Sequence, residues 1–373
     1  MKSLTRKLRG QYFREAVIYF LTFCLVLNTS LPAVMATPSG GVFTVGTGSI
    51  VEGANTAVTV NQVQSIIQWG APGSGGIDTS AAESLTFLQA EGLSNSAVLN
   101  RIMSGNPTQF NGLLNASGMN IFIVNPAGVV FGSGSQVNVS QLVASSLDIA
   151  DGDFLAGNYE FLAGSANGTV ANYGDISATQ GAALIGKRVL NAGTITTGNS
   201  GFVVMAAGNR VLLGEPGSKI VVEMDSVTPT EEGDGDVVNN GQISSPAGTV
   251  VLAAGDIFSV PLQSQLRVNS GTVEEPVYEV GDQPVRVESG IGTVTQSGTI
   301  NADGIDGDGG SVVLTAGDEV ILGAGSSTTA NGGVSNSGAN GGEVIAYASE
   351  VYADNALVDF QAGAQIEVTG GSP

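Results

Sequence analysis

Three short apolar units recur through the second half of the sequence, and this repetition restricts the possible fold more than any other feature. One unit combines Asn, Gly and Ile, as in Asn-Ala-Gly-Thr-Ile; another is a Gly-bounded run such as Gly-Thr-Val-Val-Leu-Ala-Ala-Gly; the third reads Val-x-Leu-Gly. Copies of the first begin at Asn172, Asn191 and Asn240, of the second at Gly201, Gly248 and Gly310, and of the third at Val211 and Val320. Such self-similarity is typical of a solenoid, in which each repeat packs only against its neighbours.

Short β-branched runs separated by Gly or Asn turns, three to a coil, predict an all-β fold: a right-handed parallel β-helix. Inward Val, Ile and Leu side chains of one coil would stack on those of the next. The copies are unevenly spaced, so we expect insertions in some coils and place them at residues 222–236 and 273–284.

The ends of such a stack expose strand edges that invite pairing with other chains. Residues 40–100 are less repetitive and contain the single Trp of the chain, so we predict that they form an N-terminal β cap. Residues 94–103 are one of the few stretches with helical spacing, and we expect a short helical turn or a loop there.

Residues 1–36 have the pattern of a signal peptide. A basic start is followed by an apolar core at residues 16–27, too short to span a bilayer comfortably, and by a small residue, Ala36, at a suitable cleavage point. An uncleaved anchor is the alternative. The single cysteine, Cys24, lies in this segment, so the exported chain would contain no disulfide, which suits passage through a pore in an unfolded state.

The composition excludes several classes of function. The chain has no histidine, which rules out His-based catalytic triads, imidazole acid–base chemistry and His metal sites. The formal charge of −21 repels nucleic acid, and removal of the basic signal peptide would make it more negative. We predict no cofactor.

Residues 120–132 predict a strand, a tight turn and a second strand. The turn is Asn125, Pro126, Ala127 and Gly128, flanked by the apolar runs 121–124 and 129–131. Asn, Pro and Gly at its first, second and fourth positions are typical of a type I turn, because Pro fixes φ and the Asn side chain bonds the backbone ahead of it.

Together with its surroundings, this turn resembles a known family. The apolar succession from residue 98 to Phe161, with Ile66–Trp69 and residues 83–89 upstream, is similar to the N-terminal secretion (haemagglutination activity) domain of filamentous haemagglutinin-like exoproteins of two-partner secretion systems. The resemblance covers about residues 40–165, so we divide the chain into a signal peptide, a secretion domain with its cap at 37–165, and further coils at 166–373. Ala127 and Val129 depart from the family's usual Asn-Pro-Asn-Gly-Ile, and residues 70–73 replace an aromatic that commonly follows the Trp.

The resemblance implies a non-enzymatic protein secreted to the medium or the surface of a Gram-negative-type bacterium. Its implied partner is an outer-membrane transporter with periplasmic receptor domains, and the implied later activity is adhesion or haemagglutination through a host-cell or glycan receptor. By the same resemblance Asn125, Pro126, Ala127 and Gly128 are the predicted residues for transporter recognition. Their structural role is to form the turn, and the two roles do not exclude each other.

Two alternatives depend on carboxylates. β-Helices include carbohydrate-active enzymes and carbohydrate-binding surface proteins; the enzymes need clustered carboxylates, often beside a basic residue. The only adjacent basic pair of the exported chain, Lys187 and Arg188, has no such cluster beside it in sequence. Residues 303–310 and 231–236 are acidic loops that could hold Ca²⁺. Neither follows a known calcium-loop pattern, so we expect solvated acidic turns and no metal.

Overall fold

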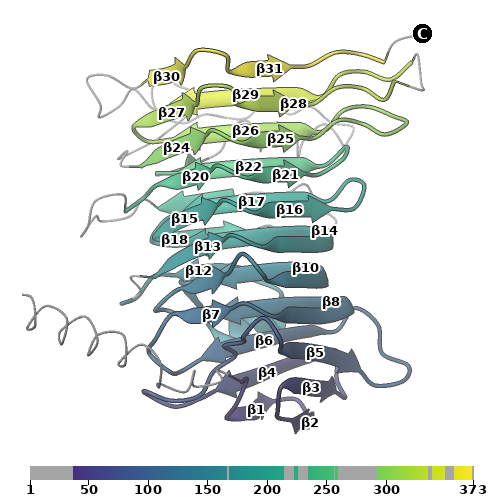
Figure 1. The fold of residues 1–373 in the computed structure, drawn as a ribbon, viewed down its shortest axis with the longest axis vertical. Coiled ribbons are helices and arrows are strands. Elements are labelled where there is room, and N and C mark those ends of the chain that lie inside the picture. Colours follow the sequence, from purple (N-terminus) through teal and green to yellow (C-terminus); the bar gives the residue numbers. More distant parts are fainter. Residues whose placement is uncertain are drawn as a thin grey trace, which may run out of the picture. The chain divides into compact units, whose positions relative to one another are not determined.

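The strands wind into a parallel β-helix with three sheets, here called faces A, B and C. In the computed structural model the described residues are 37–165, 168–213, 222–225, 234–255, 257–258, 292–334, 338–348 and 357–371. The predicted signal peptide and the predicted insertion at 273–284 lie outside them, and only residues 222–225 and 234–236 of the other insertion are described. Figure 1 shows the coils stacked from β1 to β31. The fold is nearly all-β, as predicted.

Except at the two ends of the stack, each coil contributes one strand, or one half of a long bent strand, to each face. Face A contains β3 (Asn55–Val60), β5 (Ser84–Gln89), the first halves of β8 (Leu113–Val124), β10 (Gln136–Ser145) and β14 (Asp175–Gly186), and β16 (Thr194–Thr197), β21 (Gln242–Ser244), β25 (Thr299–Asn301), β28 (Ser327–Thr329) and β31 (Gln365–Glu367). Face B contains β4 (Gln64–Trp69), β6 (Ala97–Ile102), the second halves of β8, β10 and β14, and β17 (Phe202–Ala207), β22 (Thr249–Ala254), β26 (Ser311–Ala316) and β29 (Glu343–Ala348). Face C contains β7 (Thr108–Phe110), β9 (Val129–Phe131), β13 (Thr169–Asn172), β15 (Arg188–Asn191), β20 (Val237–Asn239), β24 (Thr293–Gln296), β27 (Glu319–Leu322) and β30 (Leu357–Phe360).

The faces differ in how their strands are buried. On face A, Ile176, Ile195, Ile243 and Ile300 pair in register and point inward, whereas most of the neighbouring side chains are exposed or half-buried. Face B strands are apolar throughout: in β17, Val203 and Met205 enter the solenoid core, while Val204 enters a second apolar cluster outside it. A strand buried on both sides needs a continuous apolar run, which is the Gly-bounded repeat seen in the sequence.

The second apolar cluster exists because an antiparallel sheet covers the outside of face B. Its strand order is β11 (Asp148–Ile149), β12 (Tyr159–Leu162), β18 (Arg210–Leu213), β19 (Val222–Asp225) and β23 (Ile257–Phe258). All five strands belong to excursions that leave the solenoid at the corner between face B and face C. The first excursion, of which residues 146–165 are described, also contains the helix α2 (Asp151–Ala156) and was not predicted from the sequence.

A ladder of buried amides runs inside the corner between faces C and A. Asn172 donates its side-chain amide to Asn191 (2.9 Å), Asn191 to Asn239 (2.8 Å), and Asn239 to Gln296 (2.7 Å). All four side chains are fully buried. The repeated Asn at 172 and 191 is thus a structural residue that joins successive coils. In the third copy this position is Asn239, whereas Asn240, from which the sequence pattern starts that copy, is exposed.

At the N-terminal end, antiparallel pairs close the stack: β1 (Gly41–Val45) pairs with β4, and β2 (Gly48–Val51) with β3. Trp69 is fully buried beneath them and donates its indole N–H to Asn100 (2.9 Å). The expectation of a helical turn or loop at residues 94–103 is wrong, because Ala97–Ile102 is the face B strand β6. Its burial on both sides produced the helix-like spacing. In the described part of the chain, no helix is long and apolar enough to cross a membrane.

Candidate functional site

The predicted turn forms the corner between β8 on face B and β9 on face C, as the sequence indicated. The amide of Gly128 donates to the carbonyl of Asn125 at 2.8 Å. Ala127 has a negative φ, which fits type I rather than type II. Gly128 has φ of 116°, and a Cβ there would lie 2.7 Å from the carbonyl oxygen of Thr169 on the next coil. No side chain fits at this position.

Asn125 holds the corner together from inside. Its Nδ2 donates to the carbonyl of Asn106 (2.8 Å) and to Oγ1 of Thr108 (2.9 Å), and its Oδ1 accepts the amide of Ala127 (3.0 Å). Its backbone amide donates to the carbonyl of Ser145 on the next coil (2.9 Å). The residue is 1% exposed. Its side chain therefore fixes the turn and is not presented to a partner of the folded domain.

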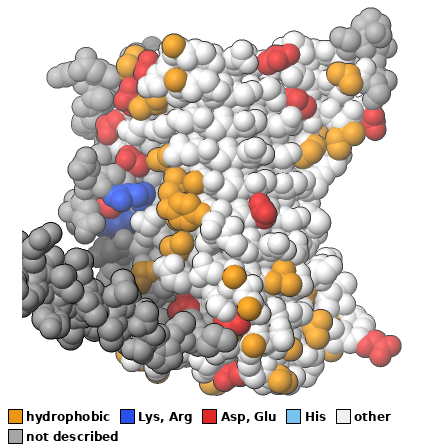
Figure 2. Space-filling view, in the orientation of Figure 1, with side chains coloured by type: hydrophobic (Ala, Val, Ile, Leu, Met, Phe, Trp, Pro, Cys, Tyr) orange, Lys and Arg blue, Asp and Glu red, His pale blue; other side chains and the backbone are white. Residues whose placement is uncertain are grey.

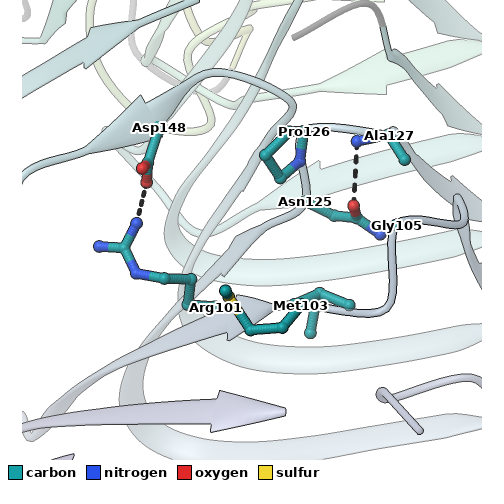
Figure 3. A pocket seen from close by; sticks show the side chains of 8 residues that line it. Arg101, Met103, Gly105, Asn125, Pro126, Ala127 and Asp148 are labelled. Carbon is teal, nitrogen blue, oxygen red and sulfur yellow. Dashed lines mark hydrogen bonds and ion pairs between the residues drawn. The ribbon is translucent and has the colours of Figure 1, made fainter. Parts of the chain in front are cut away.

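Pro126 and Ala127 form the outer part of the corner. Pro126 is exposed and Ala127 half-buried. They border a depression of about 270 Å³, which Figure 3 shows from close by. The depression is lined by Arg101, Ile102, Met103, Gly105, Asn125, Pro126, Ala127 and Asp148.

Arg101 is the charged residue beside this corner. It lies on β6, in register with Val124, and its side chain is 13% exposed. The guanidinium forms an ion pair with Asp148 and donates to the carbonyl of Ile149 (2.8 Å) and to the carboxylate of Asp151 (2.8 Å). Figure 3 shows the ion pair at the opposite side of the depression from Ala127. Sequence reasoning missed this group, because nothing in the spacing of Arg101 and Asp148 indicates that they meet.

The alternative hypothesis of a carbohydrate-active enzyme needs carboxylates gathered beside a basic residue. Among the described residues Asp236 interacts with Asp234 and Asp318 close to the basic pair Lys187 and Arg188. These carboxylates do not line the depression at the Asn125 corner. A second, polar depression of about 410 Å³ crosses the glycine corners between faces C and A, and Asp175 is the single carboxylate among its lining residues. Figure 2 shows a broad face with few charged side chains.

In the acidic loop 303–310, two carboxylates accept hydrogen bonds from backbone amides. Asp303 accepts the amide of Asn331 (2.6 Å) and Asp308 that of Asn340 (2.7 Å), each on the next coil. Of the loop 231–236 only residues 234–236 are described, and Asp234 lies 3.8 Å from Lys187. Within the described residues no group of three or more Asp, Glu, His or Cys side chains is arranged to hold a metal ion.

Known proteins resemble this chain in sequence and in fold. The heme/hemopexin-binding protein of Haemophilus influenzae is 26% identical over 258 residues, which cover 58% of this chain and 28% of that protein. The chain thus spans less than a third of the length of that relative. The crystal structure of the HMW1 secretion domain from Haemophilus influenzae superposes with a TM-score of 0.60 at 23% identity, covering 90% of this chain and 84% of that one. The second similarity supports the β-helical fold.

A family model described as the TPS secretion domain matches residues 35–333, which is most of the chain. The match confirms the resemblance drawn from the sequence. It extends well beyond residue 165, and β10 on one side of that position pairs directly with β14 on the other. Members of the family are generally non-catalytic parts of exoproteins that Gram-negative bacteria export with a cognate transporter. The chain belongs to the two-partner secretion (TPS) domain family.

Proposed function

We propose that this chain directs the export of an adhesin-like exoprotein, and that Asn125, Pro126, Ala127 and Gly128 are recognised by the periplasmic domains of its cognate outer-membrane transporter. The observation that carries the proposal is the difference in exposure between neighbouring residues of the corner. Asn125 is buried and fully engaged in hydrogen bonds, while Pro126 is placed on the surface. Such a corner can serve turn formation and recognition together.

The sequence around the corner suits recognition before folding. No charged residue lies between Arg101 and Asp148. An uncharged, β-forming segment of this length can add as a strand to an exposed sheet edge of a partner, because it brings no charge that would have to be desolvated. In the folded domain most of the same apolar side chains are buried in the stack, so this mode of binding fits the unfolded chain that crosses the periplasm.

For the activity of the exported protein, the proposal is based only on the activity that is usual among filamentous haemagglutinin-like exoproteins. We propose adhesion or haemagglutination at the cell surface or in the medium, through a receptor or glycan. Binding of haem or hemopexin is named for a relative of which this chain covers 28%, and this chain has no histidine to ligate haem iron. Agglutination of red cells by the exported full-length exoprotein tests the adhesive part.

Site-specific crosslinking tests the recognition proposal. A photo-crosslinking amino acid replaces Pro126 in one variant and Thr196 in the other, both exposed, in cells that also make the transporter. We expect an adduct with the transporter's periplasmic domains from position 126 and little or none from position 196. Equal adducts from both positions, or none from 126, would contradict the proposal.

A further inference from the structure

Residues 146–163, here called the latch, reach back over coils that precede them in the chain. The chain leaves face B after β10, forms β11, α2 and β12, and lies against the outside of β4, β6 and β8. Gln64 on β4 donates its side-chain amide to the carbonyl of Phe154 in α2 (3.3 Å). On the other side β12 pairs with β18 of a later excursion. The latch therefore joins the capped end of the solenoid to its middle.

Arg101 is the polar fastening of the latch. All three of its acceptors, Asp148, Ile149 and Asp151, belong to the latch. The exposed fraction of 13% includes the cover that the latch itself provides. Before the latch arrives these three acceptors are absent, so the hydrogen bonds that hold the guanidinium in its native position have not yet formed.

Phe122 is the apolar fastening. It lies on β8 three residues before Asn125 and is 1% exposed. Its ring contacts Phe154 edge-on and Tyr159 at a tilt, both at 5.2 Å between centroids, and both partners belong to the latch. Without the latch, the outer side of β8, including Val124, loses its cover from water.

These contacts make the geometry of the corner depend on a segment that comes later in the chain. We propose that closure of the latch fixes the Asn125 corner, so that the corner stays unfolded and open to the transporter until residues 146–163 have docked. The effect of the latch on export rests on the proposed function. Docking of residues 146–163 does not, because it can be measured on the exported chain without the transporter. Arg101 acts here as a positioning residue, through the latch.

Native-state hydrogen exchange of the exported full chain tests closure without the transporter. In Arg101→Gln, amides of residues 121–132 should exchange at least tenfold faster than in the wild type, while amides of β22 are unchanged. The matched control is Arg188→Gln, which loses a contact to Asp234 at the same edge, three coils further on, outside the latch. It should leave exchange at 121–132 unchanged. The proposal is overturned if the amides of residues 121–132 exchange in Arg101→Gln at the wild-type rate, or if both variants accelerate their exchange equally.

Two further measurements keep the test decisive. If Arg101→Gln does not fold, Asp151→Ala removes one acceptor only and should give a smaller acceleration, about threefold, confined to the same amides; no acceleration overturns the latch. Export of Arg101→Gln should at least equal that of the wild type, and a tenfold fall would place Arg101 in the signal itself and overturn the latch. Normal export of Asn125→Ala would instead refute the proposed function and leave the exchange result standing.

Discussion

Arg101 and Asp148 form an ion pair on the outside of face B, although no charged residue lies between them in the sequence. The uncharged segment that they bracket contains two turns of the solenoid wall and the corner at residues 125–128. Folding thus removes this segment from water and brings its two flanking charges together. The arrangement explains how one segment can be an apolar strand for a partner and then an interior wall of the domain.

Asn125→Ala should lower the free energy of unfolding by about 3 kcal/mol, because the carbonyl of Asn106, Oγ1 of Thr108 and the amide of Ala127 lose their partner inside the protein. Pro126→Ala, at the exposed tip, should cost less than about 1 kcal/mol, through the entropy of the unfolded chain. Urea unfolding followed by the fluorescence of Trp69 measures both. Equal costs would argue that the side chain of Asn125 does not hold the corner.

Asn191→Ala should be destabilising by about 3 kcal/mol, since it breaks the amide ladder on both sides and leaves Asn172 and Asn239 with unmet polar groups. The neighbouring residue in the ladder's repeat, Asn240, is exposed, and Asn240→Ala serves as the control with a change within about 0.5 kcal/mol. Thermal or urea unfolding compares the two. A harmless Asn191→Ala would show that the ladder is not needed for stacking.

Two glycines make a matched pair for the packing of corners. A Cβ on Gly241 would lie 2.1 Å from the carbonyl oxygen of Gly193 on the preceding coil, whereas one on Gly152 in α2 meets nothing within 4 Å. Gly241→Ala should therefore prevent close stacking and lower stability by several kcal/mol. Gly152→Ala should be neutral or raise stability by roughly 0.5–1 kcal/mol through helix propensity. The urea midpoints of unfolding of the two variants test this comparison. A Gly241→Ala variant as stable as the wild type would contradict the close approach of neighbouring coils at this corner.

The carboxyl group of Asp236 should make the free energy of unfolding fall as pH rises. Burial raises the pKa of this carboxyl above its usual value, opposed by the amide of Thr293 and by Arg188 and reinforced by Asp318 and Asp234. The folded state therefore holds the proton more tightly than the unfolded state, and stability falls as pH rises from the unfolded pKa, about 4, through the folded one.

Asp236→Asn removes this loss but keeps an acceptor for the amide of Thr293. The variant should be more stable than the wild type at neutral pH, with a difference that shrinks below about pH 4. Urea midpoints at the two pH values test it. A variant that is less stable at neutral pH would mean that the charge of Asp236 is favourable where it lies.

The repeats allowed the solenoid to be predicted because they report the interior directly. Ile195 and Ile243 recur since each must cover the same residue of the next coil, and Asn191 recurs since its amide must meet another amide. The corner was predictable for a local reason, the turn chemistry of Asn125 and Gly128. These patterns depend on near neighbours in sequence or on identical positions in successive coils.

The extra sheet over face B was not predicted, because its strands carry no repeat and pair with partners far away in the sequence. Phe161, for example, pairs with Val211 in an antiparallel register that only the folded chain defines. The continuous apolar run of β17 is typical of a strand buried on both sides, but the sequence analysis predicted only its inward side chains and no cover for its outer side. The same applies to Arg101, whose acceptors lie in a segment that leaves the solenoid and returns.

The most direct test of the account is the export of Asn125→Ala beside Asn239→Ala, in cells that make the cognate transporter. Both changes remove a buried, hydrogen-bonded Asn, but only the first touches the corner. Measured as the fraction of signal-peptide-processed protein that reaches the medium, Asn125→Ala should fall at least tenfold and Asn239→Ala should stay near the wild type. Unchanged export of Asn125→Ala, or an equal fall in both, would contradict a role of the corner in export.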